Sequence, residues 1–271
     1  MDKQLIRSRF SKAVDSYNKS ATVQKRIAHK MIRLIGKKIG LEHRFLLEVG
    51  CGTGFFSRLL SQDIHSHTMV LNDICPEMKG KVTDILNENN SFLCGDAETI
   101  AFPHDIDLIT SCSTIQWFGD LDAFFNKCHY SLKEDGFFAF AGFGKENMKE
   151  IGTLTDTTLK YHSKAALEEK LAVSGFEIIH SEEDTIKILF ETPLQVLHHL
   201  KKTGVTGITK YTWTKGKLQK YNEDYNTRFG KDGCVPLTYN PIFIIAKKKS
   251  NHFNETIMSS KISQTEVNKP S

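Results

Sequence analysis

Short apolar runs and helical apolar patterns alternate along residues 44–142. The apolar runs are nearly continuous, which is typical of strands that are buried on both faces of a sheet. The predicted strands are at 45–47, 68–74, 91–94, 106–111 and 136–141. Helical patterns separate several of them, and strands that alternate with helices indicate a parallel sheet. This block therefore predicts an α/β, Rossmann-like fold.

The first 43 residues predict a helical cap in front of this block. They carry two helical patterns with a break near residues 18–20, and the second pattern has an apolar stripe. A basic stripe runs beside the apolar one and consists of Arg26, Lys30, Arg33 and Lys37. Such a stripe is compatible with a solvated helix face or with a docking surface for an acidic protein.

Further strands and a helical insertion are predicted after residue 162. A helix at 163–175 precedes a long strand pattern at 176–190, and an apolar strand at 242–246 comes last. Two lysine-rich helices occupy about 192–235, between these strands. We therefore expect a seven-stranded, mostly parallel sheet with helices on both faces and a helical insertion before the last strand.

The composition is that of a globular protein, with 271 residues, 39% hydrophobic and 25% charged. This length accommodates one large domain at 44–248, and the polar segment at 249–271 is expected to be a disordered tail. No apolar run reaches membrane-spanning length and no apolar signal region starts the chain, so we expect a cytoplasmic protein. The six scattered cysteines form no C-x-x-C pair, which predicts reduced thiols and no metal site. The net charge of +4 does not by itself indicate nucleic acid binding.

The loop at 48–54 is the strongest candidate for chemistry. Its sequence, Glu48-Val49-Gly50-Cys51-Gly52-Thr53-Gly54, joins a predicted strand to a predicted helix. The first two glycines let the backbone approach a ligand, and free amides at the helix start can hold an anion. The spacing differs from the G-x-G-x-x-G of dinucleotide folds and resembles motif I of the class I S-adenosylmethionine (SAM) methyltransferases. We therefore expect the loop to hold the methionyl carboxylate, with Glu48 accepting from the methionyl ammonium.

Polar residues follow the next strands at the same predicted edge of the sheet. Asp73 ends the second strand, where a carboxylate can accept from both ribose hydroxyls, or can instead cap the helix beginning at Pro76. Asp96 follows the third strand and suits the exocyclic amine of adenine, with turn formation as the alternative. After the fourth strand, Gln116 and Trp117 are expected in the pocket wall, unless the tryptophan is a core residue.

Three further segments are more selective than the glycine loop. They are Phe10-Ser11-Lys12-Ala13 with Tyr17-Asn18, the run from Leu200 to Val205, and Pro236-Leu237-Thr238-Tyr239. Ala21-Thr22-Val23-Gln24 follows the first of them. Together with the loop, they resemble the malonyl-acyl-carrier-protein O-methyltransferases of biotin synthesis, and the resemblance covers most of residues 7–248. One departure is Ser111-Cys112-Ser113, where the family has Ser-Asn-Leu.

The resemblance implies a cofactor and the residues that bind it. The cofactor is SAM, and S-adenosyl-L-homocysteine (SAH) is its product. The residues implied to bind it are Tyr17, Glu48, Gly50, Cys51, Gly52, Thr53, Gly54, Asp73, Ile74, Met78, Asp96, Ala97 and Gln116.

The resemblance also implies methyl transfer to the free carboxylate of a malonyl thioester, an early step of biotin synthesis. A carboxylic acid with a pKa of about 4 is already ionised at pH 7, so no general base is expected. We expect Tyr17, Trp117, Tyr211 and Tyr239 to position the substrate, although each tyrosine is also compatible with core or lid packing.

The implied partner is acyl-carrier protein, whose acidity favours a docking role for the basic segments. We expect residues 25–38 and 201–220 to contact it. Malonyl-coenzyme A is an alternative carrier of the malonyl group. No nucleic acid or membrane partner is expected.

Three other functions are compatible with the sequence. A class I methyltransferase for another small molecule, such as a quinone precursor, would use the same cofactor residues. An RNA methyltransferase should show a concentrated basic and aromatic surface or an added module, which is not evident. A non-catalytic SAM-binding scaffold also fits, because no single residue is a diagnostic catalyst.

Overall fold

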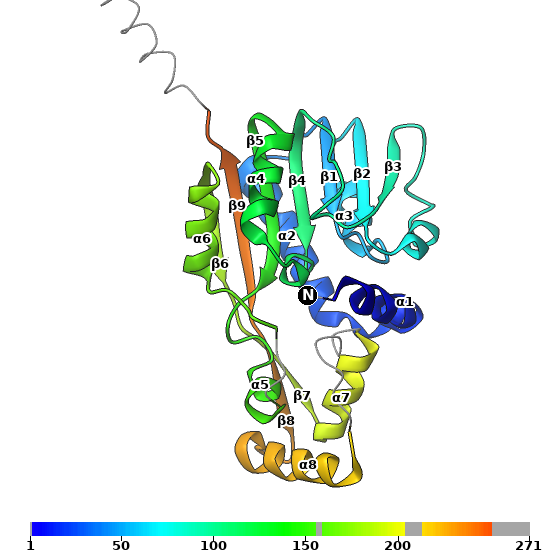
Figure 1. Ribbon diagram of the computed structural model, residues 1–271, viewed down its shortest axis with the longest axis vertical. Helices are drawn as coiled ribbons and strands as arrows, with labels where there is room; N and C mark the ends of the chain where they lie inside the picture. The colour runs from blue at the N-terminus through cyan, green and yellow to red at the C-terminus, as the bar shows by residue number, and fades with distance from the viewer. Residues whose placement is uncertain (1, 156–158, 204–212, 251–271) are drawn as a thin grey trace, which may run out of the picture.

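A seven-stranded sheet forms the centre of the protein (Figure 1). The structure is a computed structural model that describes residues 2–155, 159–203 and 213–250, apart from the side chains of 12–19. The strands in spatial order are β3 (Asn90–Cys94), β2 (Thr68–Asp73), β1 (Phe45–Val49), β4 (Ile106–Cys112), β5 (Leu132–Phe143), β9 (Pro241–Lys248) and β6 (Phe176–Glu183). Pairs from β3 to β5 are parallel, and β9 is antiparallel to both neighbours. The expected mostly parallel, seven-stranded sheet is confirmed.

Helices cover both faces of this sheet, because successive strand residues point to opposite sides. On β1, Leu46 packs with α2 (Thr22–Ile39) and α3 (Phe55–Asp63). The next residue, Leu47, belongs to a second buried cluster that also contains residues of α4 (Leu121–Ser131) and α6 (Lys164–Val173). Burial on both faces explains why the strands appear in the sequence as nearly continuous apolar runs.

The predicted N-terminal cap consists of two helices, α1 (Lys3–Ser20) and α2, with the break at Ala21. In Figure 1, α1 crosses below the carboxyl ends of the parallel strands, whereas α2 runs behind the sheet. Phe10 of α1 packs edge-on against Trp117, with ring centroids 5.4 Å apart. Trp117 belongs to the short 3₁₀ helix η2 (Ile115–Trp117) after β4. The cap therefore lies over the edge where ligands are expected.

The long strand pattern at 176–190 is divided in the structure. β6 ends at Glu183, and β7 (Ile186–Phe190) leaves the main sheet to pair with β8 (Val235–Tyr239). Asp184 lies at the bend, where its carboxylate accepts from Thr185 N (2.8 Å) and from Lys30 Nζ (3.1 Å). The prediction of one continuous strand is wrong here because the bend depends on contacts with α2, which is distant in sequence.

A smaller lobe extends below the sheet (Figure 1). It contains β7, β8, α5 (Lys149–Thr155), α7 (Pro193–Lys202) and α8 (Lys215–Phe229). Tyr225 of α8 is fully buried, and its hydroxyl donates to Pro236 O at 2.6 Å. The helices α7 and α8 lie where the insertion was expected. Neither α5 nor the second, two-stranded sheet was predicted, because short elements give weak periodic patterns.

Two negative findings concern the described residues. Within 2–155, 159–203 and 213–250, none of the helices combines the length and apolar character that a membrane span needs. In the same residues, no three His, Cys, Asp or Glu side chains are grouped as a set of metal ligands.

Candidate active site

A cavity of about 1160 Å³ lies at the carboxyl ends of β1, β2 and β4. The order of strands reverses between β1 and β4, and open α/β sheets bind ligands at such a switch point. The loops after these strands form one side of the cavity. The cap helices form the other side, through Lys3, Phe10 and Gln24.

Most residues expected to bind SAM line this cavity. They are Glu48, Gly50, Cys51, Gly52, Thr53, Asp73, Ile74, Met78, Asp96 and Ala97. Gly54 is the N-cap of α3 and is not part of the wall, and Gln116 lines two neighbouring cavities instead. The side chain of Tyr17 and all of Tyr211 lie outside the described residues.

The backbone of the glycine loop requires residues without a Cβ. Gly50, Gly52 and Gly54 have φ angles of 76°, 53° and 81°, in the left-handed region that other residues rarely adopt. A Cβ on Gly50 would overlap the side chain of Thr114, which follows β4. A Cβ on Gly52 would meet nothing within 4 Å and would occupy open space at the cavity wall. The loop therefore packs closely at Gly50 and leaves room for a ligand at Gly52.

This difference predicts distinct effects for two alanine substitutions. Gly50→Ala should lower the free energy of unfolding by about 3 kcal/mol or more, because backbone strain and overpacking add. Gly52→Ala should lower it by only about 1–2 kcal/mol, from strain alone, and should mainly weaken SAM binding. Denaturant unfolding and calorimetric titration with SAM would measure both quantities. Equal unfolding losses for the two variants would contradict the role given to Thr114.

Glu48 is a buried carboxyl at the base of the cavity. Its Oε2 atom has no hydrogen-bond partner among the described residues. Burial raises the pKa of Glu48 to about 8, the nearby Asp73 carboxylate adds to the increase, and the Ser57 hydroxyl opposes it. A buried acceptor without a donor is costly in an empty protein. A cationic donor from a ligand would satisfy it.

Asp73 connects the loops that follow β1 and β2. One carboxylate oxygen accepts from Gly52 N and the other from Cys75 N, both at 2.8 Å. Burial raises the pKa of Asp73, and these two N–H donors oppose the increase. The 3₁₀ helix η1 (Pro76–Lys81) has Cys75 as its N-cap, so capping by Asp73 itself is not what the structure shows. Each carboxylate oxygen keeps a further lone pair for a ligand donor.

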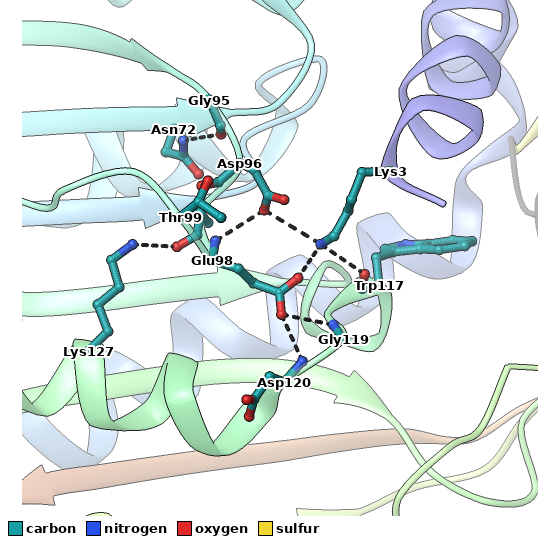
Figure 2. Close-up of polar contacts among 11 residues, drawn as sticks. Lys3, Asn72, Gly95, Asp96, Glu98, Thr99, Trp117, Gly119, Asp120 and Lys127 are labelled. Carbon is teal, nitrogen blue, oxygen red and sulfur yellow. Dashed lines mark hydrogen bonds and ion pairs between the residues drawn. The ribbon is translucent and has the colours of Figure 1, made fainter. Parts of the chain in front are cut away.

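Lys3 joins the cap to the loop after β3 (Figure 2). Its Nζ lies 3.5 Å from Asp96 Oδ1, pairs with Glu98 and donates to Trp117 O at 3.2 Å. Asp96 also accepts from Glu98 N at 3.1 Å, which is the turn contact considered as the alternative role for this residue. Asp96 lines the cavity as well. Glu98 in turn accepts from the backbone N–H groups of Gly119 and Asp120 (2.8 Å each). Polar contacts thus hold the start of α1 against the cavity.

A smaller cavity of about 360 Å³ adjoins the first. The two share Phe10, Gln24, Ser113 and Trp117 in their walls. Tyr239, which was expected near the substrate, lines the smaller cavity, and its hydroxyl lies 2.8 Å from His199 Nε2. The remaining lining residues are Gln116, Phe143, Asn147, Met148, Leu159, Tyr161 and Thr203. Trp117 is therefore part of the cavity walls and is also packed against the cap.

Sequence reasoning missed several residues of these cavities. They are Lys3, Gln24, Ser113, Phe118, Asn147 and Tyr161. Gln24 lies in a segment that carried the family resemblance, so that segment was the only signal for it. Asn147 and Tyr161 belong to no predicted element, and nothing local distinguishes them from surface residues.

Comparisons with known proteins agree with this architecture. Residues 47–140 match a family model described as a methyltransferase domain. Among solved structures, the YcgJ protein of Bacillus subtilis has a TM-score of 0.59 at 18% identity, covering 82% of this chain and 100% of that one. A Haemonchus contortus phosphoethanolamine N-methyltransferase complex has a TM-score of 0.52 at 16% identity, covering 82% and 53%. At these identities the similarity shows the fold alone.

Curated relatives are much more similar in sequence. A malonyl-[acyl-carrier protein] O-methyltransferase of Bacteroides thetaiotaomicron is 47% identical over 260 residues, covering 92% of this chain and 99% of that protein. One of the same name from Haemophilus influenzae is 36% identical over 251 residues, covering 91% and 95%. The chain therefore belongs to the malonyl-[acyl-carrier protein] O-methyltransferase family.

Proposed function

We propose that this protein methylates the free carboxylate of a malonyl group carried by acyl-carrier protein, with SAM as the methyl donor. The observation that best supports SAM as the cofactor is the pair of buried carboxyls, Glu48 and Asp73, beside a glycine loop that leaves the cavity open. Relatives that align along nearly the whole chain are named malonyl-[acyl-carrier protein] O-methyltransferases, which supports malonyl-acyl-carrier protein as the substrate.

The cavity fits the methionyl, ribose and adenine parts of SAM. The partnerless Oε2 of Glu48 suits the methionyl ammonium, and the open space at Gly52 leaves room for the methionyl chain. Asp73 can accept from the ribose hydroxyls through its remaining lone pairs. Asp96, whose backbone begins the turn after β3, suits the exocyclic amine of adenine.

The surrounding residues suit displacement without a general base. When bound, SAM supplies an electrophilic methyl group: a carboxylate oxygen forms the new C–O bond, the C–S electron pair stays on sulfur, and no proton is released. Phe10, Trp117, Phe143 and Leu159 give the smaller cavity apolar walls. An apolar setting favours a step in which a cation and an anion neutralise each other, and it strips water from the carboxylate.

A third cavity, of about 1250 Å³, supports a path for the thioester arm. It shares Gln116, Trp117, Phe143, Leu159 and Tyr161 with the smaller cavity. Its other walls carry Lys160 and His162, on the segment that precedes α6. A flexible acyl arm entering here would bring its malonyl end to the smaller cavity.

The basic surface of α2 supports docking of the acidic carrier, but Lys30 differs from the other basic residues of the predicted stripe. Lys30 pairs with Glu182 (2.7 Å) and Asp184 (3.1 Å), so its charge is already engaged within the protein. Arg26 and Arg33 are exposed two turns apart on the same helix face. We therefore place the carrier contact on these arginines. Lys201 and Lys202, at the exposed end of α7, are a second candidate contact.

Charge reversal tests this surface. Arg26→Glu with Arg33→Glu should raise KM for malonyl-acyl-carrier protein about 10-fold, leave kcat nearly unchanged and flatten the salt dependence. Arg44→Glu with Lys231→Glu is the matched control, since these exposed residues lie on other elements and carry the same charge change. Equal effects from both pairs would remove the arginines from the docking surface.

The activity itself is tested by intact mass after incubation with SAM. A gain of one methyl group on malonyl-acyl-carrier protein, without a gain on acetyl-acyl-carrier protein, is expected. Malonyl-coenzyme A run in parallel would compare the two carriers of the malonyl group. SAM binding with no methylation of any malonyl thioester would favour a small-molecule substrate or a non-catalytic role.

A further inference from the structure

The smaller cavity gathers four buried polar atoms whose hydrogen-bonding capacity is not filled by the described residues. Gln24 Oε1 and Gln116 Oε1 are amide oxygens, which accept hydrogen bonds, whereas Ser113 Oγ and Asn147 Nδ2 can donate them. Buried polar groups in proteins are nearly always hydrogen-bonded to protein, ordered water or ligand, so the two donors in this group can receive a polar ligand atom. Of these four residues, only Gln116 belongs to the set expected to bind SAM.

Asn147 is the most constrained of these groups. It is 2% exposed, and its Oδ1 accepts from Asn240 N at 3.2 Å. Its own backbone N–H donates to Gly144 O at 3.1 Å. Because the carbonyl oxygen of the side chain is engaged by a backbone donor, the NH₂ group is the part that faces the cavity, where it lies within hydrogen-bonding reach of the Tyr161 hydroxyl. Asn147 therefore offers a hydrogen-bond donor to the cavity.

Two hydroxyl groups add further donors. Burial raises the pKa of Tyr161 to about 12, so its hydroxyl stays protonated at neutral pH. Ser113 has a φ of 61°, a conformation that costs energy for a residue with a Cβ and that often marks functional sites. Gln116 holds this turn, since its Nε2 donates to Ser113 O at 2.6 Å.

The donors that the described part of the cavity wall offers are neutral. Among its described residues there is no lysine, arginine or histidine. The imidazole of His199 contacts the Tyr239 hydroxyl, and burial lowers the pKa of His199, which keeps it neutral at pH 7. Neutral donors can orient a carboxylate without the strong ion pair that would make its oxygens poor nucleophiles.

We propose that Asn147 Nδ2, together with the hydroxyls of Ser113 and Tyr161, binds the free carboxylate of the substrate. This inference rests on the proposed function and deepens it, because it assigns the group that distinguishes a malonyl from an acetyl thioester. The site adjoins the cofactor cavity through the shared residues Gln24 and Trp117. Asn147 acts as a substrate-binding and specificity-determining residue.

Asn147→Asp is the decisive variant. It keeps the oxygen that accepts from Asn240 N, but it replaces the donor with a second oxygen that repels a carboxylate. Binding of malonyl- and acetyl-acyl-carrier protein would be measured by calorimetry on SAH-saturated protein. Wild type should bind the malonyl form at least 10-fold more tightly. The variant should lose this preference, bind the acetyl form as before, and methylate malonyl-acyl-carrier protein with kcat/KM reduced about 100-fold.

Asn87→Asp is the matched control, because Asn87 Oδ1 also accepts from backbone N–H groups, in an exposed turn before β3. It should change neither binding nor turnover.

Ser113→Ala and Tyr161→Phe change little volume and should each reduce the malonyl preference about 5-fold. They test the proposed carboxylate site if Asn147→Asp does not fold.

Three outcomes would overturn the assignment. They are equal binding of both acyl forms by wild type, an unchanged preference in Asn147→Asp, or equal losses for both acyl forms in the variants. Failure of the proposed function is a separate result, since it would appear as absent methyl transfer by wild type.

Discussion

Asp73→Ala is expected to weaken SAM binding about 100-fold or more. The variant removes the buried carboxylate that we propose accepts two ribose hydroxyls, and hydrogen bonds to a charged group contribute about 1.5–3 kcal/mol each. It also releases Gly52 N, which Asp73 holds at 2.8 Å, so the glycine loop loses its connection to β2. Titration calorimetry with SAM and with SAH would measure the effect.

Asp107 provides a matched control for this variant. Both aspartates are 8% exposed, and Asp107 Oδ2 accepts from Phe45 N at 2.7 Å. Asp107 lies at the opposite end of the sheet, where β4 begins. Asp107→Ala should therefore reduce stability without changing SAM affinity. SAM affinity within threefold of wild type in Asp73→Ala would remove Asp73 from the cofactor site.

Glu48→Gln is expected to weaken SAM binding about 10- to 100-fold and to abolish its coupling to proton release. Because burial raises the pKa of Glu48 to about 8, the carboxyl is mostly protonated at pH 7 without ligand. Pairing with an ammonium group favours the ionised form, so SAM binding should release a proton from Glu48. Calorimetry in buffers with different ionisation enthalpies would measure that proton. Equal proton release by wild type and Glu48→Gln would contradict this role.

The same substitution should change how stability depends on pH. The pKa of Glu48 lies above its ordinary value of 4.5, so the folded state holds a proton that the unfolded state has lost. The free energy of unfolding therefore falls as pH rises from about 4.5 to 8, by up to about 5 kcal/mol in total for this group. Without ligand, Glu48→Gln should gain stability relative to wild type across this window, as denaturant unfolding at pH 5, 7 and 9 would show. A constant difference between the two proteins would mean that Glu48 does not carry a raised pKa.

Local patterns were sufficient for the sheet and for much of the cofactor cavity. Glu48 and Gly52 belong to one contiguous loop, and Asp73 and Asp96 follow strands that a parallel sheet brings to one edge. Their proximity follows from chain order, because the carboxyl ends of adjacent parallel strands meet. The expected break between the two cap helices was likewise visible as a loss of the helical pattern.

Only the tertiary structure decided the bend at Asp184, the closure by Lys3 and the grouping of Asn147 with Ser113 and Tyr161. Lys3 pairs with residues more than 90 positions away, and the Asp184 bend contacts Lys30 of α2. No periodic pattern records such contacts, since they depend on how the lobe and the cap pack against the sheet. The sequence by itself determined the α/β fold, the family and the glycine loop, because these depend on short-range patterns. The grouping of Asn147, Ser113 and Tyr161 arises from long-range packing, and so it became visible only in three dimensions.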